Sequence, residues 1–108
     1  MSKIVNNDVK DKNKIVIDQI ELITNGIPEQ LELINNPNQI GRIINKYNEK
    51  ISEITPLFMI GNQNALNVQE KVNSLIKAGA DPNMEICYYN RNISFTEFIK
   101  NYRTGIHI

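Results

Sequence analysis

Apolar residues recur at helical spacing in several short segments of the chain, and turn-forming residues separate these segments. In residues 15–24 the apolar positions lie on one broad helical stripe, which stops at Asn25-Gly26, where a glycine can adopt the left-handed conformation that ends a helix. A second helix of about ten residues is expected to start near Pro28 and to end at residues 35–37. The pattern therefore predicts two short antiparallel helices joined by a tight turn.

The same pattern returns in the middle of the chain. Thr55-Pro56 predicts the start of a helix, because the threonine hydroxyl can cap it and proline is favoured at the first helical position. After a break at residues 61–64, apolar residues at helical spacing between positions 68 and 76 predict a further helix, which Gly79 ends. We therefore expect a second antiparallel helix pair here.

Three other segments give weaker patterns. Residues 1–13 are polar and charged with little periodicity, which indicates a flexible lead-in to a single domain over residues 14–108. The apolar residues of 38–54 recur at i, i+3, i+4, i+7 and i+11, which favours an amphipathic helix despite Gly41. Residues 84–92 are rich in β-branched and aromatic residues without strict alternation, so this segment is either a short hairpin or an irregular loop.

One more helix is predicted near the C-terminus. Ser94 and Glu97 have the spacing of a capping box. The helix that follows carries a stripe of aromatic residues: Phe95, Phe98 and Tyr102. This stripe is exposed unless the tail, residues 105–108, or another chain covers it. We therefore expect either a tail folded over this edge or self-association through it.

Composition narrows the class of protein. With 108 residues, the chain has room for one domain, and its net charge of zero favours neither nucleic acid nor an anionic membrane as a partner. Cys87 is the only cysteine, which excludes an internal disulfide and fits a reducing compartment. The N-terminus lacks the apolar core of a signal peptide, and no run approaches the roughly 18 apolar residues of a membrane span. These features predict a cytoplasmic protein.

Two blocks of the sequence carry a family resemblance. Residues 55–57, Thr-Pro-Leu, and residues 75–83, Leu-Ile-Lys-Ala-Gly-Ala-Asp-Pro-Asn, resemble the ankyrin repeat, whose helix A begins with Thr-Pro-Leu and whose helix B ends with Leu-Leu-x-x-Gly-Ala-Asp-x-Asn. Asp81 and Asn83 can satisfy backbone groups where the chain turns outward. The segment between the blocks is a few residues longer than a repeat of about 33 residues allows, so an insertion is expected near residues 62–67.

The resemblance implies an all-α fold, an ankyrin-like solenoid of antiparallel helix pairs with short outward loops or hairpins. Residues 20–34 would form a degenerate first repeat, and residues 94–102 would be helix A of a third repeat without its helix B. For residues 46–54 the resemblance implies an outward hairpin in place of a helix. Both alternatives for this segment stay open.

The same resemblance implies a protein–protein interaction module, an adaptor or an inhibitor, and not an enzyme. Binding residues would lie on the hairpin tips and on the helix A face, and the second hairpin combines adjacent tyrosines with arginine, residue types that dominate interface hot spots. The candidates are Met84, Glu85, Ile86, Tyr88, Tyr89, Asn90 and Arg91, with Phe58 and Asn62 from the helix A face. For either tyrosine, packing beneath the loop is an equal alternative.

Two further functions are alternatives: an immunity or effector-type protein that neutralises one target, and a structural subunit that self-assembles through its C-terminal edge. Cys87 and His107, the only histidine, cannot make a zinc site of four Cys or His ligands, and a Cys/His catalytic pair would need the tail to reach Cys87. Neither a glycine-rich phosphate loop nor a basic cluster is present. We therefore expect no catalytic residue, cofactor, metal ion or small-molecule substrate, and neither nucleic acid nor membrane as a partner.

Overall fold

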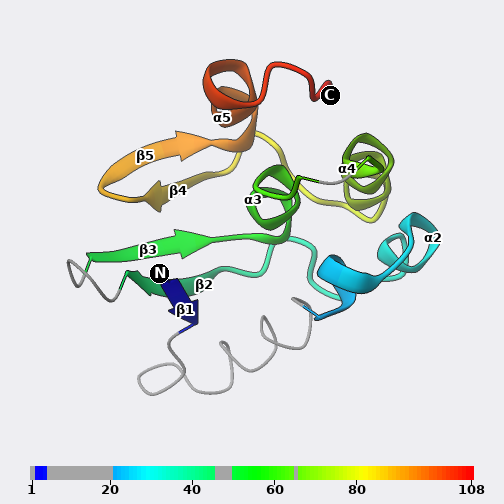
Figure 1. Cartoon of the computed structure of the whole chain (residues 1–108), viewed down its shortest axis with the longest axis horizontal. Helices are drawn as coiled ribbons and strands as arrows, with labels where there is room; N and C mark the ends of the chain where they lie inside the picture. Colours follow the sequence, from blue (N-terminus) through cyan, green and yellow to red (C-terminus); the bar gives the residue numbers. More distant parts are fainter. Residues whose placement is uncertain (1, 5–20, 46–49, 65) are drawn as a thin grey trace.

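The fold combines short helices with two small antiparallel sheets (Figure 1). The computed structural model describes residues 2–4, 21–45, 50–64 and 66–108. In chain order the elements are β1 (Ser2–Ile4), a helical segment at residues 21–25, α2 (Pro28–Leu31), β2 (Gly41–Asn45), β3 (Lys50–Ile54), α3 (Pro56–Gly61), α4 (Val68–Lys77), β4 (Glu85–Tyr88), β5 (Arg91–Ser94) and α5 (Phe95–Tyr102). No helix within these residues is long and apolar enough to cross a membrane.

The predicted all-α, ankyrin-like solenoid is wrong, because two parts of the chain form sheets. Strands β1, β2 and β3 make a three-stranded antiparallel sheet, and β4 and β5 make a two-stranded one. The spacing of apolar residues in these segments does not by itself distinguish a short helix from a strand, and pairing with a distant strand decides between them. The chain is a mixed α/β protein.

The first sheet replaces the helix favoured by the spacing of residues 38–54. Strands β2 and β3 pair along their whole length, in a register that places Gly41 opposite Ile54. Isoleucine, the commonest apolar residue of this segment, is β-branched and favours strands, whereas a glycine inside a helix costs roughly 1 kcal/mol. Residues 50–54 are therefore extended, as the hairpin alternative required, but the hairpin starts at Gly41 and not at residue 46. Its connection, residues 46–49, lies outside the described part of the chain.

Strand β1 lies within the segment expected to be flexible, residues 1–13. It pairs antiparallel with β2 and places Ser2 opposite Asn45. Residue 1 and residues 5–13 lie outside the described residues. The domain boundary predicted at residue 14 stays a prediction.

Of the two alternatives for residues 84–92, a short hairpin or an irregular loop, the hairpin is correct. Strands β4 and β5 are joined by a two-residue turn, Tyr89-Asn90, in which φ is 49° and 71°. Two successive positive φ values are typical of a type I′ turn, whose twist matches that of the strands it joins. The turn places Tyr88 directly opposite Arg91 at the tip of the hairpin.

Helices α3 and α4 form where the sequence predicts them. Pro56 occupies the first turn of α3, although the Thr55 hydroxyl makes no capping hydrogen bond. Gly79, two residues after the end of α4, has a φ of +108°, and the amides of Gly79 and Ala80 donate to carbonyl oxygens of the last turn at 3.0 and 2.9 Å. This pair of bonds is a Schellman motif, so the predicted glycine C-cap is confirmed.

The second helix of the first predicted pair is shorter than expected. Helix α2 has 4 residues, and the chain beyond it is held by turn hydrogen bonds, in which Leu33 and Ile34 donate to Gln30 and Leu31 at 3.2 and 3.3 Å. Asn36, with a φ of 51°, then turns the chain toward β2. The predicted helix of about ten residues is therefore wrong.

Helix α3 lies at the centre of the molecule, between the two hairpins and α4 (Figure 1). Its Phe58 is 1% exposed and belongs to the continuous apolar core. Side chains of β3 join the two sheets: the Glu53 carboxylate accepts from the Cys87 amide at 2.7 Å, and the Ser52 hydroxyl oxygen accepts from the Tyr89 amide at 3.1 Å. Because these bonds satisfy one amide of β4 and one of the turn after it, the second hairpin is fixed beside the first.

The C-terminal edge is covered largely from within the chain. Phe95 and Phe98 are buried, and so is Ile106 in the tail. The Gln69 side chain of α4 holds the tail, since its Oε1 accepts from the His107 amide at 2.8 Å and its Nε2 donates to the His107 carbonyl at 2.7 Å. Of the aromatic stripe on α5, Tyr102 remains exposed.

Candidate functional site

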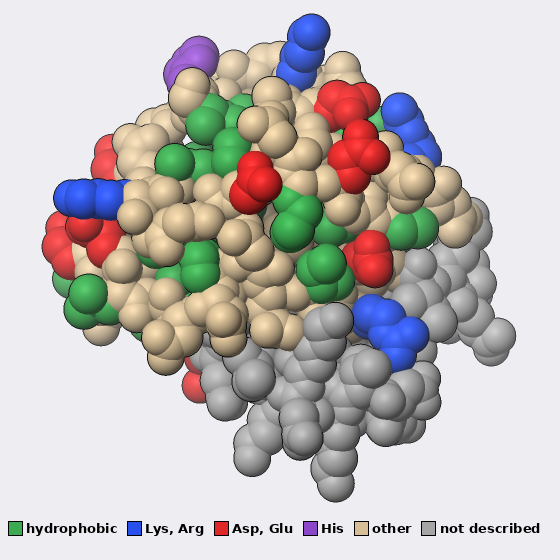
Figure 2. All heavy atoms as spheres, turned by 180° about the vertical axis from the view of Figure 1, so that it is seen from behind, with side chains coloured by type: hydrophobic (Ala, Val, Ile, Leu, Met, Phe, Trp, Pro, Cys, Tyr) green, Lys and Arg blue, Asp and Glu red, His purple; other side chains and the backbone are tan. Residues whose placement is uncertain are grey.

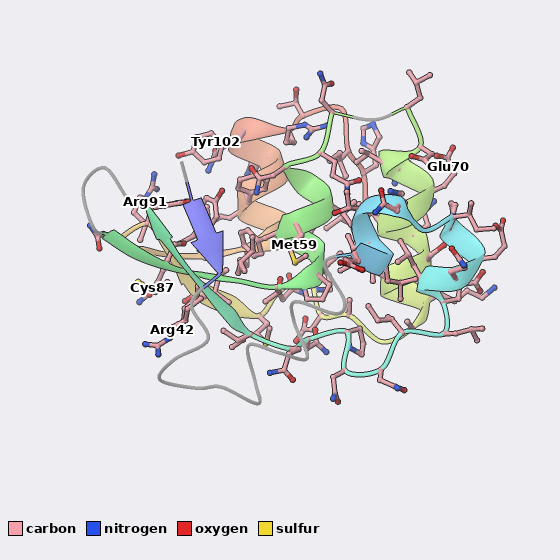
Figure 3. All side chains as sticks on the ribbon, turned by 60° about the horizontal axis from the view of Figure 1, so that its bottom comes forward. Arg42, Met59, Glu70, Cys87, Arg91 and Tyr102 are labelled. Carbon is pink, nitrogen blue, oxygen red and sulfur yellow. The ribbon has the colours of Figure 1, made fainter. Side chains whose placement is uncertain are left out.

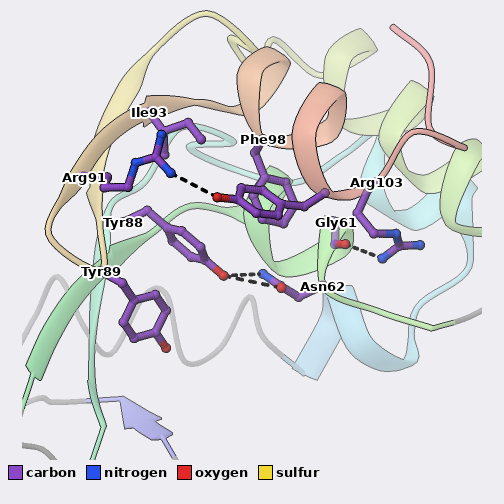
Figure 4. Close-up of a pocket in the computed structure, with 9 residues that line it drawn as sticks. Gly61, Asn62, Tyr88, Tyr89, Arg91, Ile93, Phe98 and Arg103 are labelled. Atoms are coloured by element: carbon purple, nitrogen blue, oxygen red, sulfur yellow. Dashed lines mark hydrogen bonds between the residues drawn. The ribbon is translucent and has the colours of Figure 1, made fainter.

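A concave pocket of about 450 Å³ opens where the end of α3, the β4–β5 turn and the end of α5 meet (Figure 4). We call it the aromatic pocket. Its lining residues are Gly61, Asn62, Tyr88, Tyr89, Arg91, Ile93, Phe98, Tyr102 and Arg103. The pocket draws on segments that are far apart in the sequence, and its volume falls within the range of about 300–1,000 Å³ that is usual for ligand pockets.

The aromatic rings that line the pocket contact one another. The Tyr88 ring meets the Phe98 ring edge to face with centroids 5.5 Å apart, and Phe98 meets Tyr102 at 5.6 Å. Tyr88 also contacts Tyr89 at 4.9 Å and the buried Phe58 at 5.3 Å. Rings packed in this way have little rotational freedom, so the pocket offers a largely preformed apolar surface.

Gly61 allows the two helices to approach each other beneath the pocket. A Cβ at this position would lie 2.8 Å from Cε1 of Phe95 and 3.1 Å from Cε2 of Phe98. Any larger residue would push α5 away from α3. Glycine at this position therefore allows the close packing of α5 against α3.

A hydrogen-bonded pair connects the hairpin to the end of α3. Asn62 Nδ2 donates to the Tyr88 hydroxyl at 3.2 Å, and that hydroxyl lies 3.4 Å from Asn62 Oδ1 (Figure 4). Asn62 Nδ2 also donates to the carbonyl oxygen of Phe58 at 2.8 Å, which satisfies an acceptor at the end of the helix. This contact holds Tyr88 over the core.

Burial raises the pKa of the Tyr88 phenol above its ordinary value of 10.0, and the hydrogen bond to Asn62 offsets part of the increase. In an absorbance titration of the folded protein we expect a late phenolate step, which Tyr88→Phe removes and Tyr102→Phe leaves in place. Because the folded state holds this proton more tightly, the stability it contributes is present below pH 10.0 and is lost as the pH rises through the raised pKa. A late step that persists in Tyr88→Phe would contradict the assignment.

Two arginines border the pocket. Arg91 Nη1 donates to the Tyr102 hydroxyl at 3.1 Å. Arg103 Nη1 donates to the Gly61 carbonyl oxygen and, at 2.8 Å, to that of Gln63, so this guanidinium satisfies acceptors at the end of α3. No carboxylate is among the lining residues, and the ion pair found within the described residues, Lys77 with Glu32, is elsewhere. The pocket therefore carries a local positive charge.

The structure brings four of the nine residues proposed from the sequence into the pocket: Asn62, Tyr88, Tyr89 and Arg91. Asn90 is exposed in the adjoining turn, while Met84 and Glu85 lie at the opposite end of the hairpin. Phe58 and Ile86 are 1% and 2% exposed and belong to the core, so they cannot contact a partner directly. These two apolar side chains therefore pack in the core and do not form part of a binding surface.

Sequence reasoning missed five of the lining residues, which come from α3, β5, α5 and the position after α5. These are Gly61, Ile93, Phe98, Tyr102 and Arg103. Tyr102-Arg103 had a detectable signal, because an aromatic residue followed by arginine at the end of a helix is a composition typical of interfaces. That Tyr102 lies close to Tyr88 is not visible in the sequence, since 14 positions separate these two residues along the chain.

The remaining surface offers fewer groups of this kind. Arg91 and Tyr102 lie at one end of the molecule and Glu70 of α4 at the other (Figure 3). On the face opposite to that of Figure 1, hydrophobic side chains of the described residues form small separate groups with charged residues between them (Figure 2). Within the described residues no group of three or more His, Cys, Asp or Glu side chains could hold a metal ion. Cys87 lies in β4, whereas His107 is bound to α4 on the other side of α3 (Figure 1).

Comparison with protein-family models, with curated proteins and with solved structures gave no match. The resemblance of residues 55–83 to an ankyrin repeat gains no support from these comparisons.

Proposed function

We propose that this protein is a binding module that recognises a partner protein through the aromatic pocket and the adjoining Tyr89-Asn90 turn. The observation that carries the proposal is the gathering of Tyr88, Tyr89 and Tyr102 with Arg91 and Arg103 around one concavity. Tyrosine and arginine are enriched at interface hot spots because each combines a large contact area with hydrogen-bonding groups. The role is that of an adaptor or an inhibitor, and no catalytic step is assigned to the pocket.

The pocket is suited to receive a side chain from a partner because its walls are already in place. Tyr88 is held by Asn62, and the Arg91 and Arg103 guanidinium groups are held by the Tyr102 hydroxyl and by backbone carbonyls. Side chains that are ordered before binding lose less conformational entropy on association. A stable interface buries roughly 800 Å² on each partner, so the contact must extend beyond the pocket onto the exposed hairpin turn.

The double variant Arg91→Ala/Tyr102→Ala is expected to weaken partner binding by at least about 30-fold, since hot-spot truncations cost about 2 kcal/mol or more. Both residues are exposed, so the variant should stay folded. The partner is captured from the native source and identified by mass spectrometry, and the dissociation constants of both forms for the purified partner are compared by calorimetry.

The matched control for this experiment is Lys77→Ala/Leu33→Ala, which removes one exposed cation and one exposed apolar side chain from the α2–α4 side of the molecule. It should leave the affinity unchanged. Equal affinity of the wild type and of the Arg91/Tyr102 variant would remove the pocket from the interface.

Self-assembly through the C-terminal edge has less support, because Phe95 and Phe98 are used inside the chain and Tyr102 and Ile108 are what remains exposed there. Light scattering over a concentration series separates the two functions. A monomer at high concentration rejects self-assembly, and an oligomer that the Arg91/Tyr102 variant dissociates would favour it.

A further inference from the structure

The aromatic pocket has a charge asymmetry that bears on what it binds. Two guanidinium groups border it, and no carboxylate is among the lining residues. The whole chain has a formal net charge of zero, so this positive charge is a local feature and not part of a general basic surface. A group of opposite charge on the partner would complement it.

We propose that the pocket receives an acidic segment of the partner protein, with an apolar or aromatic side chain against the tyrosine rings and carboxylates at Arg91 and Arg103. This inference rests on the proposed function and deepens it. Arg91 comes from β5 and Arg103 from the end of α5, and the two lie on either side of the aromatic rings in the view of Figure 4. A segment that spans both therefore needs a carboxylate on each side of its apolar residue.

Each guanidinium has donors left for a carboxylate. A guanidinium carries five N–H groups, and the bonds of Arg91 and Arg103 within the described residues all come from Nη1. The Nε and Nη2 hydrogens of both side chains can therefore form the two parallel bonds of an arginine–carboxylate pair. The existing bonds fix the guanidinium groups in place before binding, which favours this geometry.

The rings favour an apolar residue between the two charges. Tyr88 and Phe98 meet edge to face, and Tyr102 extends this surface toward the solvent as an exposed side chain. The pocket volume of about 450 Å³ is near the lower end of the range for ligand pockets, which suits one or two side chains and not a folded element.

A single-stranded nucleic acid would also use aromatic rings and cations, but it needs a positive groove that follows several phosphates. Two arginines around one pocket of a neutral chain give no such groove. The acidic segment is therefore the occupant that the charges favour.

The test titrates the protein with three capped peptides of equal length, Gly-Glu-Phe-Glu-Gly, Gly-Gln-Phe-Gln-Gly and Gly-Lys-Phe-Lys-Gly, and follows the amide resonances by NMR. We expect the Glu peptide to bind at least about tenfold more tightly than the Gln peptide, since charge-assisted hydrogen bonds are the stronger ones. Shifts should centre on the residues around Asn62, Tyr88 and Arg103, and affinity should fall with added salt.

Arg91→Gln should reduce binding of the Glu peptide about tenfold and change binding of the Gln peptide little. The matched control is Lys100→Gln, which removes an exposed cation of α5 that does not line the pocket and should leave binding of the Glu peptide unchanged. Thermal unfolding of both variants confirms that they are folded.

Equal binding of the Glu and Gln peptides, or shifts outside the pocket, would overturn the inference. A stronger response of the same residues to an eight-nucleotide oligothymidine would overturn it in favour of nucleic acid. If the acidic peptide fails while the purified partner still loses affinity with Arg91→Ala/Tyr102→Ala, the proposed function stands without this inference. If the partner is also unaffected, both are rejected.

Discussion

Phe58→Ala is expected to lower the free energy of unfolding by about 3–5 kcal/mol, the usual cost of truncating a buried phenylalanine. The Phe58 side chain is 1% exposed, and its ring lies 5.3 Å from Tyr88, 5.6 Å from Phe95 and 5.3 Å from Phe98 between centroids. The change removes apolar contacts and leaves a cavity in the centre of the core. The total free energy of unfolding of a small domain is about 5–15 kcal/mol, so urea unfolding followed by circular dichroism should show a severe loss of stability.

Two variants make this result specific. Phe58→Leu keeps much of the volume and should cost roughly 1 kcal/mol, and Tyr102→Ala at the exposed rim of the same ring cluster should cost less than Phe58→Ala. A loss below about 1 kcal/mol for Phe58→Ala would mean that the core is not packed as described. Weaker partner binding by a fully stable Phe58→Ala would return Phe58 to the binding surface.

Lys71→Met is expected to lower the free energy of unfolding by about 2 kcal/mol, because it removes a buried hydrogen-bond donor and keeps most of the apolar stem. Lys71 is 3% exposed, and its Nζ donates to the Ile23 carbonyl oxygen at 2.9 Å and to Gln63 Oε1 at 3.2 Å. The Thr24 carbonyl oxygen lies 3.5 Å from the same atom. These carbonyls belong to the end of the helical segment at residues 21–25, so the variant should also increase amide exchange there.

The pH dependence of the protein's stability gives a second test of the buried Lys71. Burial lowers the pKa of this ammonium group below its ordinary value of 10.5. Between the lowered pKa and 10.5 the folded state binds fewer protons than the unfolded chain, so the contribution of Lys71 to stability rises with pH in that window. Lys71→Met should lack this rise when unfolding is measured at neutral pH and again near the upper end of the window.

The control for Lys71 is Lys77→Met on the same helix. Lys77 is 74% exposed and pairs with Glu32 at 2.9 Å, and a surface ion pair of this kind contributes little. Lys77→Met should therefore lose much less stability than Lys71→Met. Equal effects of the two changes would contradict the buried role of Lys71.

Local signals in the sequence predicted the end of α4, the turn after it and the start of α5. Gly79 takes the positive φ expected of a helix C-cap, and the Ser94 hydroxyl oxygen accepts from the Glu97 amide at 3.2 Å, as expected of a helix start. Asp81 Oδ1 accepts from the Asn83 amide at 2.9 Å, which confirms the turn after α4. Each of these bonds joins residues close in the chain, so residue type and spacing are enough to predict it.

The sheets could not be predicted in the same way. Pairing of Gly41 with Ile54 depends on a partner strand, and isoleucine at mixed spacing suits a helix stripe and a strand equally well. Assignment of the whole chain to an all-α class failed for this reason. The prediction of the site was incomplete for a related reason. The sequence indicated Tyr88 and Arg91, but Phe98 and Arg103 line the same pocket only because α5 packs on α3 at Gly61.

The sequence by itself determined where helices α3, α4 and α5 lie, how α4 ends and α5 starts, and that an aromatic and basic segment lies near Tyr88-Tyr89. These features depend on contacts within a few residues of each other. Only the tertiary structure decided that Phe58 and Ile86 belong to the core, that Tyr102 and Arg103 line the same pocket as the hairpin, and that this pocket carries two guanidinium groups without a lining carboxylate. Such features depend on packing between distant segments, which residue spacing does not encode.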